Sequence, residues 1–354
     1  MAEVAIEDRI YRHETKQQPT ANAPGKIVQA FGLGKCPKLV EQVRSDILEV
    51  RVNTLRVLCD EFRNPTSIAG VVKAGLMSIL PGMVFDPDLD TRKFSSKAMV
   101  AAARDYNGRT ALLEVGAPAT VFPALDDANV DVRRNIYEAL ANTSTTGPGM
   151  RALVEAGYPA KLVEKAVKET PEIRPLALMV LCNVISNRVG LEKALAASLV
   201  ETLIGLLGEE SSEEVQREAS VTLALACFDD MGKIIAIQNN GVSVLSELLR
   251  APACEVRSAA MGALMMITTV DAGKRAIMST SAADEAVKAL SEKEDVLLLN
   301  SLKLVASIAA HPDIRLELKE DKACLPSIRA LQESADPMIA KHSSIALEAV
   351  LWEP

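Results

Sequence analysis

The sequence repeats with a period of about 41 residues, and this period constrains the fold more than any other feature of the chain. Each period is marked by a β-branched or aliphatic residue followed by a basic one. The regular pairs are Val50-Arg51, Thr91-Arg92, Val132-Arg133 and Ile173-Arg174; the series continues as Val215-Gln216 and Val256-Arg257 and degrades to Val296-Leu297 and Met338-Ile339. A second marker, a small residue, recurs in step at Gly75, Gly116, Gly157, Ser198, Gly241 and Ser281. Two markers in register indicate a structural repeat.

Each period is predicted to form three helices. The first is short and ends at the small residue, as in 108–116, 149–157 and 232–241, where a left-handed residue stops a helix. The second has apolar residues on one face, namely Leu162, Val163, Ala166 and Val167 in one period. The third begins at the basic marker and aligns Val132, Ile136, Ala139 and Leu140, or Val256, Ala260, Leu264 and Ile267. No such helix can bury its face alone, so the periods must stack.

Three helices in a period of this length are typical of armadillo repeats, whereas two-helix repeats have about 33 or 34 residues. We therefore expect an all-α, right-handed superhelical solenoid of about eight three-helix armadillo repeats over residues 26–354, with the last two decayed. Residues 1–25 are polar and mixed in charge, which predicts an extended N-terminal arm. Trp352, the only tryptophan, is expected to cover the open end of the stack rather than to anchor a partner.

Composition and charge narrow the function. Hydrophobic residues make up 49% of the chain but aromatic residues only 3%, so aliphatic side chains must build the core, and this favours stacked helices. The net charge of −8 argues against a nucleic-acid or anionic-membrane binder. Uncharged stretches such as 258–270 are too short to span a bilayer, and the acidic N-terminus has no apolar region. We expect a soluble protein outside the secretory pathway.

No pattern of catalytic or ligand-binding residues is found. The six cysteines form no C-x-x-C pair and the three histidines are far apart, which predicts free buried thiols and no metal site. Gly32-Leu33-Gly34-Lys35-Cys36 lacks the first glycine and the final Ser or Thr of a phosphate-binding loop. Neither G-x-S-x-G nor H-E-x-x-H occurs. We therefore expect no cofactor, no small-molecule substrate and no enzymatic activity.

The third helices of an armadillo stack line a groove that binds other proteins. In nuclear-import receptors of this class, repeated Asn and Trp residues hold an extended basic peptide. Nine residues after the markers this chain has Asn142 and Asn183, but elsewhere Asp60, Ala101, Leu225, Met266 and Ala306, without Trp. This disfavours an import receptor.

Four residues are candidate partner contacts. Asn142 and Asn183 either contact a partner or bond the backbone of their own repeat, and both alternatives stay open. Arg133 and Arg134 are the other two, and charge reversal at either is expected to weaken docking while the fold stays helical. Loss of helix instead would mean that these residues are structural and open and brace the third helix. Met265, Met266 and Ile267 are either ordinary core or a surface for a folded partner.

Several segments resemble the armadillo proteins of the ciliary radial spoke, the radial spoke head 14 homolog group. The resemblance is carried by residues 25–39, by Leu55-Arg56-Val57-Leu58-Cys59-Asp60 with Asn64-Pro65, and by the runs 259–274 and 299–306. It implies a structural subunit of the T-shaped spokes that link the outer doublets to the central pair of the axoneme and relay signals controlling dynein. Its partners would be spoke scaffold and stalk proteins, and its location the cilium or flagellum.

Two other classes of function stay open. One is a cytosolic armadillo adaptor that binds disordered peptide segments in signalling or transport, against which the broken asparagine series counts. The other is an enzyme regulator or assembly chaperone, because a solenoid that holds a client for a short time has the same sequence properties as one that holds it permanently.

Overall fold

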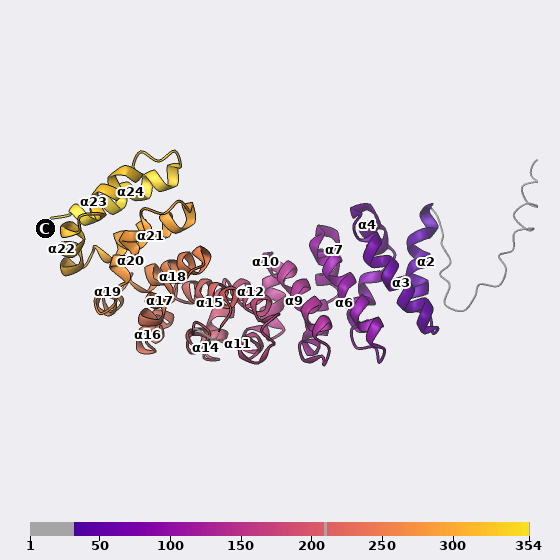
Figure 1. The fold of residues 1–354 in the computed structure, drawn as a ribbon. Coiled ribbons are helices and arrows are strands. Elements are labelled where there is room, and N and C mark those ends of the chain that lie inside the picture. The colour runs from indigo at the N-terminus through magenta and orange to yellow at the C-terminus, as the bar shows by residue number, and fades with distance from the viewer. Residues whose placement is uncertain (1–31, 209–210, 354) are drawn as a thin grey trace, which may run out of the picture. The chain divides into compact units, whose positions relative to one another are not determined.

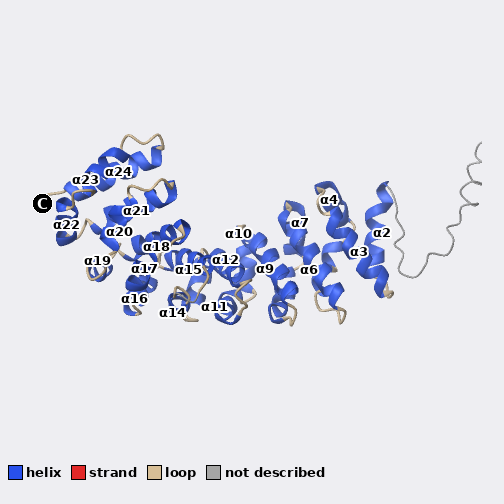
Figure 2. Ribbon diagram, in the orientation of Figure 1, coloured by secondary structure: helices blue, strands red, loops and turns tan. Residues whose placement is uncertain are grey.

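Helices account for 76% of the computed structural model, which describes residues 32–208 and 211–353. Within those ranges no strand is present, as Figure 2 shows. The chain divides into two compact units, of which the first ends at Asn142 and the second begins at Thr143. The predicted arm, residues 1–25, lies outside the described residues. The predicted division into that arm and a repeat domain over 26–354 stays a prediction.

The first unit contains the following α-helices among its described residues (Figure 1): α2 (Lys35–Val43), α3 (Leu48–Glu61), α4 (Pro65–Lys73), α5 (Leu80–Met83), α6 (Leu89–Arg104), α7 (Tyr106–Glu114), α8 (Ala117–Val121) and most of α9 (Val130–Ser144). Short 3-10 turns, η2 (Leu76–Ser78) and η3 (Phe122–Asp126), adjoin α5 and α8.

The second unit continues the pattern with α10 (Gly147–Glu155), α11 (Tyr158–Lys168), α12 (Arg174–Ile185), α13 (Arg188–Leu195), α14 (Leu199–Gly205), α15 (Glu213–Ala226), α16 (Asp230–Gln238), α17 (Gly241–Leu248), α18 (Cys254–Ile267), α19 (Asp271–Ile277), α20 (Ala282–Ala289), α21 (Asp295–Ile308), α22 (Pro312–Glu320), α23 (Cys324–Leu331) and α24 (Pro337–Leu351).

The helices recur in sets of three, and the longest of each set forms a continuous stack within its unit. In the first unit α3 packs on α6; in the second α12, α15, α18, α21 and α24 pack each on the next. The predicted buried faces of α9 and α18 are confirmed, since all eight of their residues named above are less than 5% exposed. The chain is thus a helical solenoid, in which the core runs between the third helices of successive repeats.

The prediction for α11 was wrong at one position. Leu162, Val163 and Ala166 are buried, but Val167 is 55% exposed. One residue turns a helix by about 100°, and this step carries Val167 out of the buried face.

A left-handed residue separates the first and second helices of most repeats, as the small-residue marker predicts. Gly157, with φ of 89°, precedes α11 and ends α10 without the steric penalty that a Cβ would bring. Gly75, Gly116 and Ser198 occupy the same conformation. In the later repeats the marker was misplaced: Asn240, not Gly241, is left-handed, and Ser281 has a φ of −88°. Asparagine tolerates this conformation better than most residues, so no glycine is required there.

In five repeats a different glycine marks where the first helix crosses the end of the preceding third helix. A Cβ on Gly232 would overlap the carbonyl oxygen of Ala226 and lie 2.8 Å from its carbonyl carbon. The same collision with the residue six positions earlier would occur at Gly108, Gly149, Gly190 and Gly273. At these five positions a Cβ would overlap the backbone of the preceding helix, so the close contact requires glycine.

In the last two repeats, the residue that begins the buried face of the third helix lies one position later than predicted. Val296 and Met338 are 66% and 48% exposed, whereas Leu297 and Ile339 are buried. Leu297 and Ile339 therefore correspond to the buried Val256 of α18, because the buried face and not the residue type defines the register.

No single helix in the described ranges is long and apolar enough to cross a membrane. Two consecutive segments, Pro65–Lys73 and Leu76–Met83, reach the required length and apolar composition only when they are taken together, and a bend of 69° separates them.

Candidate protein-binding surface

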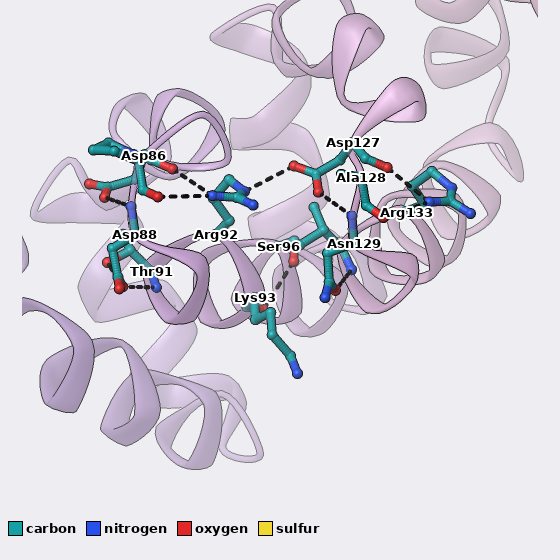
Figure 3. Close-up of polar contacts among 12 residues, drawn as sticks. Asp86, Asp88, Thr91, Arg92, Lys93, Ser96, Asp127, Ala128, Asn129 and Arg133 are labelled. Carbon is teal, nitrogen blue, oxygen red and sulfur yellow. Dashed lines mark hydrogen bonds and ion pairs between the residues drawn. The ribbon is translucent and has the colours of Figure 1, made fainter.

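The basic marker residue bonds the turn before its own helix and the corresponding turn of the next repeat. Arg92 Nη1 donates to the carbonyl oxygens of Asp86 and Pro87 at 3.0 and 3.2 Å, in the turn that precedes its own helix (Figure 3). Its Nε donates to Asp127 Oδ2 at 3.0 Å, in the corresponding turn one repeat later. One guanidinium therefore fixes a turn and joins two repeats.

Equivalent side chains make equivalent bonds along the chain. Hydrogen bonds to the preceding turn are made by Arg51 to Ser45 O, Arg133 to Asp127 O, Arg174 to Glu169 O, Gln216 to Gly208 O and Arg257 to Ala251 O, at 2.8 to 3.0 Å. Ion pairs to the next repeat join Arg51 with Asp86 at 3.4 Å and Arg257 with Glu292 at 3.2 Å. The series explains why a basic residue recurs in this position.

Two of the candidate contact residues, Arg133 and Arg134, lie side by side on α9. Arg133 Nη1 donates to Asp127 O at 2.8 Å and to Ala128 O at 3.4 Å (Figure 3). Arg134 Nη1 lies 3.4 Å from Asp131 Oδ1 in its own helix. Arg133 thus makes the contacts of the bracing alternative. Docking by either residue stays a prediction.

We expect Arg133→Glu to lower the thermal midpoint, because it places a carboxylate against two carbonyl oxygens that now accept hydrogen bonds. Thermal denaturation followed by circular dichroism measures this. Arg133→Lys, which keeps the charge, should recover part of the midpoint. An unchanged midpoint for Arg133→Glu would show that the brace adds no stability, and would leave docking as the role of this residue.

The two asparagines differ in what they contact. Asn142 Nδ2 donates to Glu138 O at 2.7 Å, one turn earlier in α9, so the backbone alternative describes this bond. Asn183 Nδ2 donates to Ser144 Oγ at 2.9 Å, on the preceding third helix. Both side chains are half-buried.

Asn135 and Asn300, which the sequence analysis did not single out, link neighbouring third helices as Asn183 does. Asn135 Nδ2 donates to Lys93 O at 3.3 Å and Ser96 Oγ at 3.0 Å. Asn300 Nδ2 donates to Ser258 O at 2.9 Å and Ser258 Oγ at 3.2 Å. Each bond joins neighbouring third helices. For Asn135 the available signal was a polar residue two positions after the basic marker, whereas the repeat of Asn300 has lost that marker.

A cleft of about 640 Å³ opens in the first unit among α3, α4, α6 and α9. It is lined by Cys59, Asp60, Phe62, Arg63, Pro65, Ile68, Lys97, Val100, Ala101, Arg104, Asp105, Asn135 and Glu138. Asp60 and Ala101 are two of the groove positions identified in the sequence. Exposed ion pairs, Asp60 with Arg63 and Arg104 with Glu138, stand at its rim. The cleft is suited to a polar protein surface, because its charges of both signs are accessible.

Among the described residues, Cys59 is the one cysteine that lines this cleft. Burial raises the pKa of the Cys59 thiol to about 11, although nearby Lys97 opposes the shift. A thiol in this state stays protonated and unreactive at neutral pH. Of the six free cysteines, Cys227 and Cys324 are buried as predicted and the other four are partly exposed. Within the described ranges, no three His, Cys, Asp or Glu side chains are grouped to hold a metal ion.

The second unit has a groove of about 430 Å³ among α21, α22 and α24. Ile345 and Trp352, 41% and 52% exposed, lie on α24 and just after it, and the Arg315 guanidinium lies 4.7 Å from the centre of the tryptophan ring. Trp352 therefore lines an accessible groove, and its role in covering the end of the stack stays a prediction. Met265 and Met266 of α18 are also partly exposed, whereas Ile267 is core.

Comparisons with known proteins give one curated relative and several similar structures. No family model matches the sequence. Radial spoke protein 14 of Chlamydomonas reinhardtii is 26% identical over 117 residues, which are 33% of this chain but only 30% of that protein. The chain thus resembles a radial spoke protein over about a third of its length.

Crystal structures of engineered proteins share the fold. One has a TM-score of 0.82 and 25% identity, covering 91% of this chain and 79% of its own. Two others have TM-scores of 0.61 with 25% and 23% identity, and each covers 66% of this chain. These similarities support a helical solenoid.

Proposed function

We propose that the protein is a non-catalytic scaffold subunit of the axonemal radial spoke, built from armadillo repeats. The observation that carries the proposal is the similarity to the radial spoke protein of Chlamydomonas reinhardtii. Its partners would be other spoke proteins in the stalk or neck, bound along the third helices, and its location would be the cilium or flagellum. In this role it would support control of dynein-driven motility.

The surfaces of both units support such a role. Each unit exposes a cleft or groove formed by third helices, and a stack of such helices presents a long surface to other proteins. Burial keeps the Cys59 thiol of the cleft protonated, and Asp60 and Arg104 are engaged in ion pairs with Arg63 and Glu138, which fits binding rather than catalysis.

The test is extraction of isolated cilia from cells that express the protein. Cilia are treated with detergent and washed with increasing salt, and each fraction is quantified by proteomics. A spoke subunit should resist detergent and leave the axoneme in fixed ratio with spoke scaffold proteins. Recovery in the detergent-soluble fraction or the cytosol would contradict the proposal and favour a transient adaptor.

A further inference from the structure

A second groove in the second unit, of about 320 Å³, lies at the N-terminal ends of α15, α18 and α21. It is lined by Arg217, Val221, Cys254, Glu255, Ser258, Ala259, Glu294, Val296, Leu297 and Asn300. Val221 and Val296 are 39% and 66% exposed. The groove therefore has an accessible aliphatic floor.

Val296 occupies a position where the repeat otherwise places an acid. In six earlier repeats, an acidic residue lies two positions before the residue that bonds the preceding turn (Arg51, Arg92, Arg133, Arg174, Gln216 or Arg257). These acids are Glu49, Asp90, Asp131, Glu172, Glu214 and Glu255. Carboxylates in the first turn of a helix are favoured by the helix dipole. Asp295 supplies a first-turn carboxylate to α21, and Val296 beside it is 66% exposed, so burial in the fold does not account for the valine. A valine in this position is better explained by contact with a partner.

Carboxylates flank the aliphatic floor. Glu255 and Glu294 are exposed, and among the described residues neither is in an ion pair or a side-chain hydrogen bond. The third nearby acid, Glu292, is paired with Arg257. The pKa of the Cys254 thiol is raised, mainly by burial. Arg257 opposes this rise, and the carboxylates of Glu294, Glu255 and Glu292 add to it. The one basic lining residue, Arg217, forms an ion pair with Glu218. The rim therefore carries two carboxylates, Glu255 and Glu294, that form no ion pair with a described residue.

We propose that this groove binds a basic amphipathic segment of a partner protein, whose aliphatic side chains pack on Val221 and Val296 while its Lys or Arg side chains pair with Glu255 and Glu294. Burying valine surface supplies the affinity. The two carboxylates select basic partners over acidic ones. The inference gives the proposed scaffold function a partner chemistry.

The test uses the purified full chain and a fluorescent 18-residue helical peptide with leucine on one face and lysine on the other. A second peptide has the same leucines and glutamate in place of lysine. Fluorescence anisotropy gives the affinities for the native protein, for Val296→Glu and for Glu255→Lys with Glu294→Lys. Val189→Glu is the matched control, since Val189 is also the second residue of its helix and 50% exposed, but lies outside the groove.

Val296→Glu separates docking from general charge attraction. It makes the protein more negative, so non-specific attraction of the lysine peptide would strengthen, whereas docking in the groove should weaken about tenfold. We expect the double lysine variant to weaken binding similarly, Val189→Glu to leave it within twofold, and the glutamate peptide to bind poorly.

The proposal is overturned if the lysine peptide does not bind, if Val296→Glu binds it equally or more tightly, or if the two peptides bind alike. Because the measurement uses no cilia, its failure leaves the spoke proposal standing. Failure of the ciliary extraction likewise leaves the groove result intact.

Discussion

Gly232→Ala is expected to lower the free energy of unfolding by about 3 kcal/mol, because the added methyl group overpacks a close contact between two helices. The new Cβ would collide with the carbonyl of Ala226, which belongs to the last turn of α15 and cannot move without disturbing that helix. The first helix of the repeat, α16, would have to shift away. Urea denaturation followed by circular dichroism measures the loss, and hydrogen exchange should place it in α15 and α16.

Gly205→Ala is the matched control, because no atom lies within 4 Å of a Cβ built at this helical position of the same unit. It should leave stability unchanged or raise it by up to about 1 kcal/mol, since alanine favours helix more than glycine does. If both variants were equally stable, the close approach of helix backbones would not explain the repeated glycine.

Arg92→Ala is expected to cost about 2 kcal/mol, because it removes hydrogen bonds to two carbonyl oxygens and leaves Asp127 without its cation. The side chains of Arg92 and Asp127 are only 20% and 12% exposed, so water replaces these bonds poorly. The urea midpoint should fall, and amide exchange should rise in the turns before α6 and α9.

Arg63→Ala serves as the control within the first unit. Its ion pair with Asp60 joins side chains that are 84% and 76% exposed, so its removal should change stability by no more than about 0.5 kcal/mol. Arg92→Lys should recover only part of the loss, because one ammonium group cannot match the spread of guanidinium donors. Equal effects of Arg92→Ala and Arg63→Ala would refute the role of the marker as a brace.

The candidate surface was less predictable than the fold. The sequence placed Asp60 and Ala101 on the groove side of their helices, and both line the cleft of the first unit. It left bracing and docking by Arg133 as alternatives, since the bond from Arg133 to Asp127 O depends on how the turn before α9 folds back. It also missed the link from Asn135 to Ser96, because the partners are 39 residues apart and meet only when two repeats stack.

The sequence by itself determined that this chain is helical and repetitive, because a period near 41 residues with apolar stripes permits burial only by stacking. Tertiary structure decided the register of the last repeats, where the basic marker is lost and only the burial of Leu297 and Ile339 shows which residues face the core. It also decided which side chains link neighbouring repeats and which remain exposed to solvent. Arg92 and Val296 both stand near the start of a third helix, yet one joins two repeats and the other lies exposed in a groove, since the outcome depends on the neighbouring repeat that each one meets.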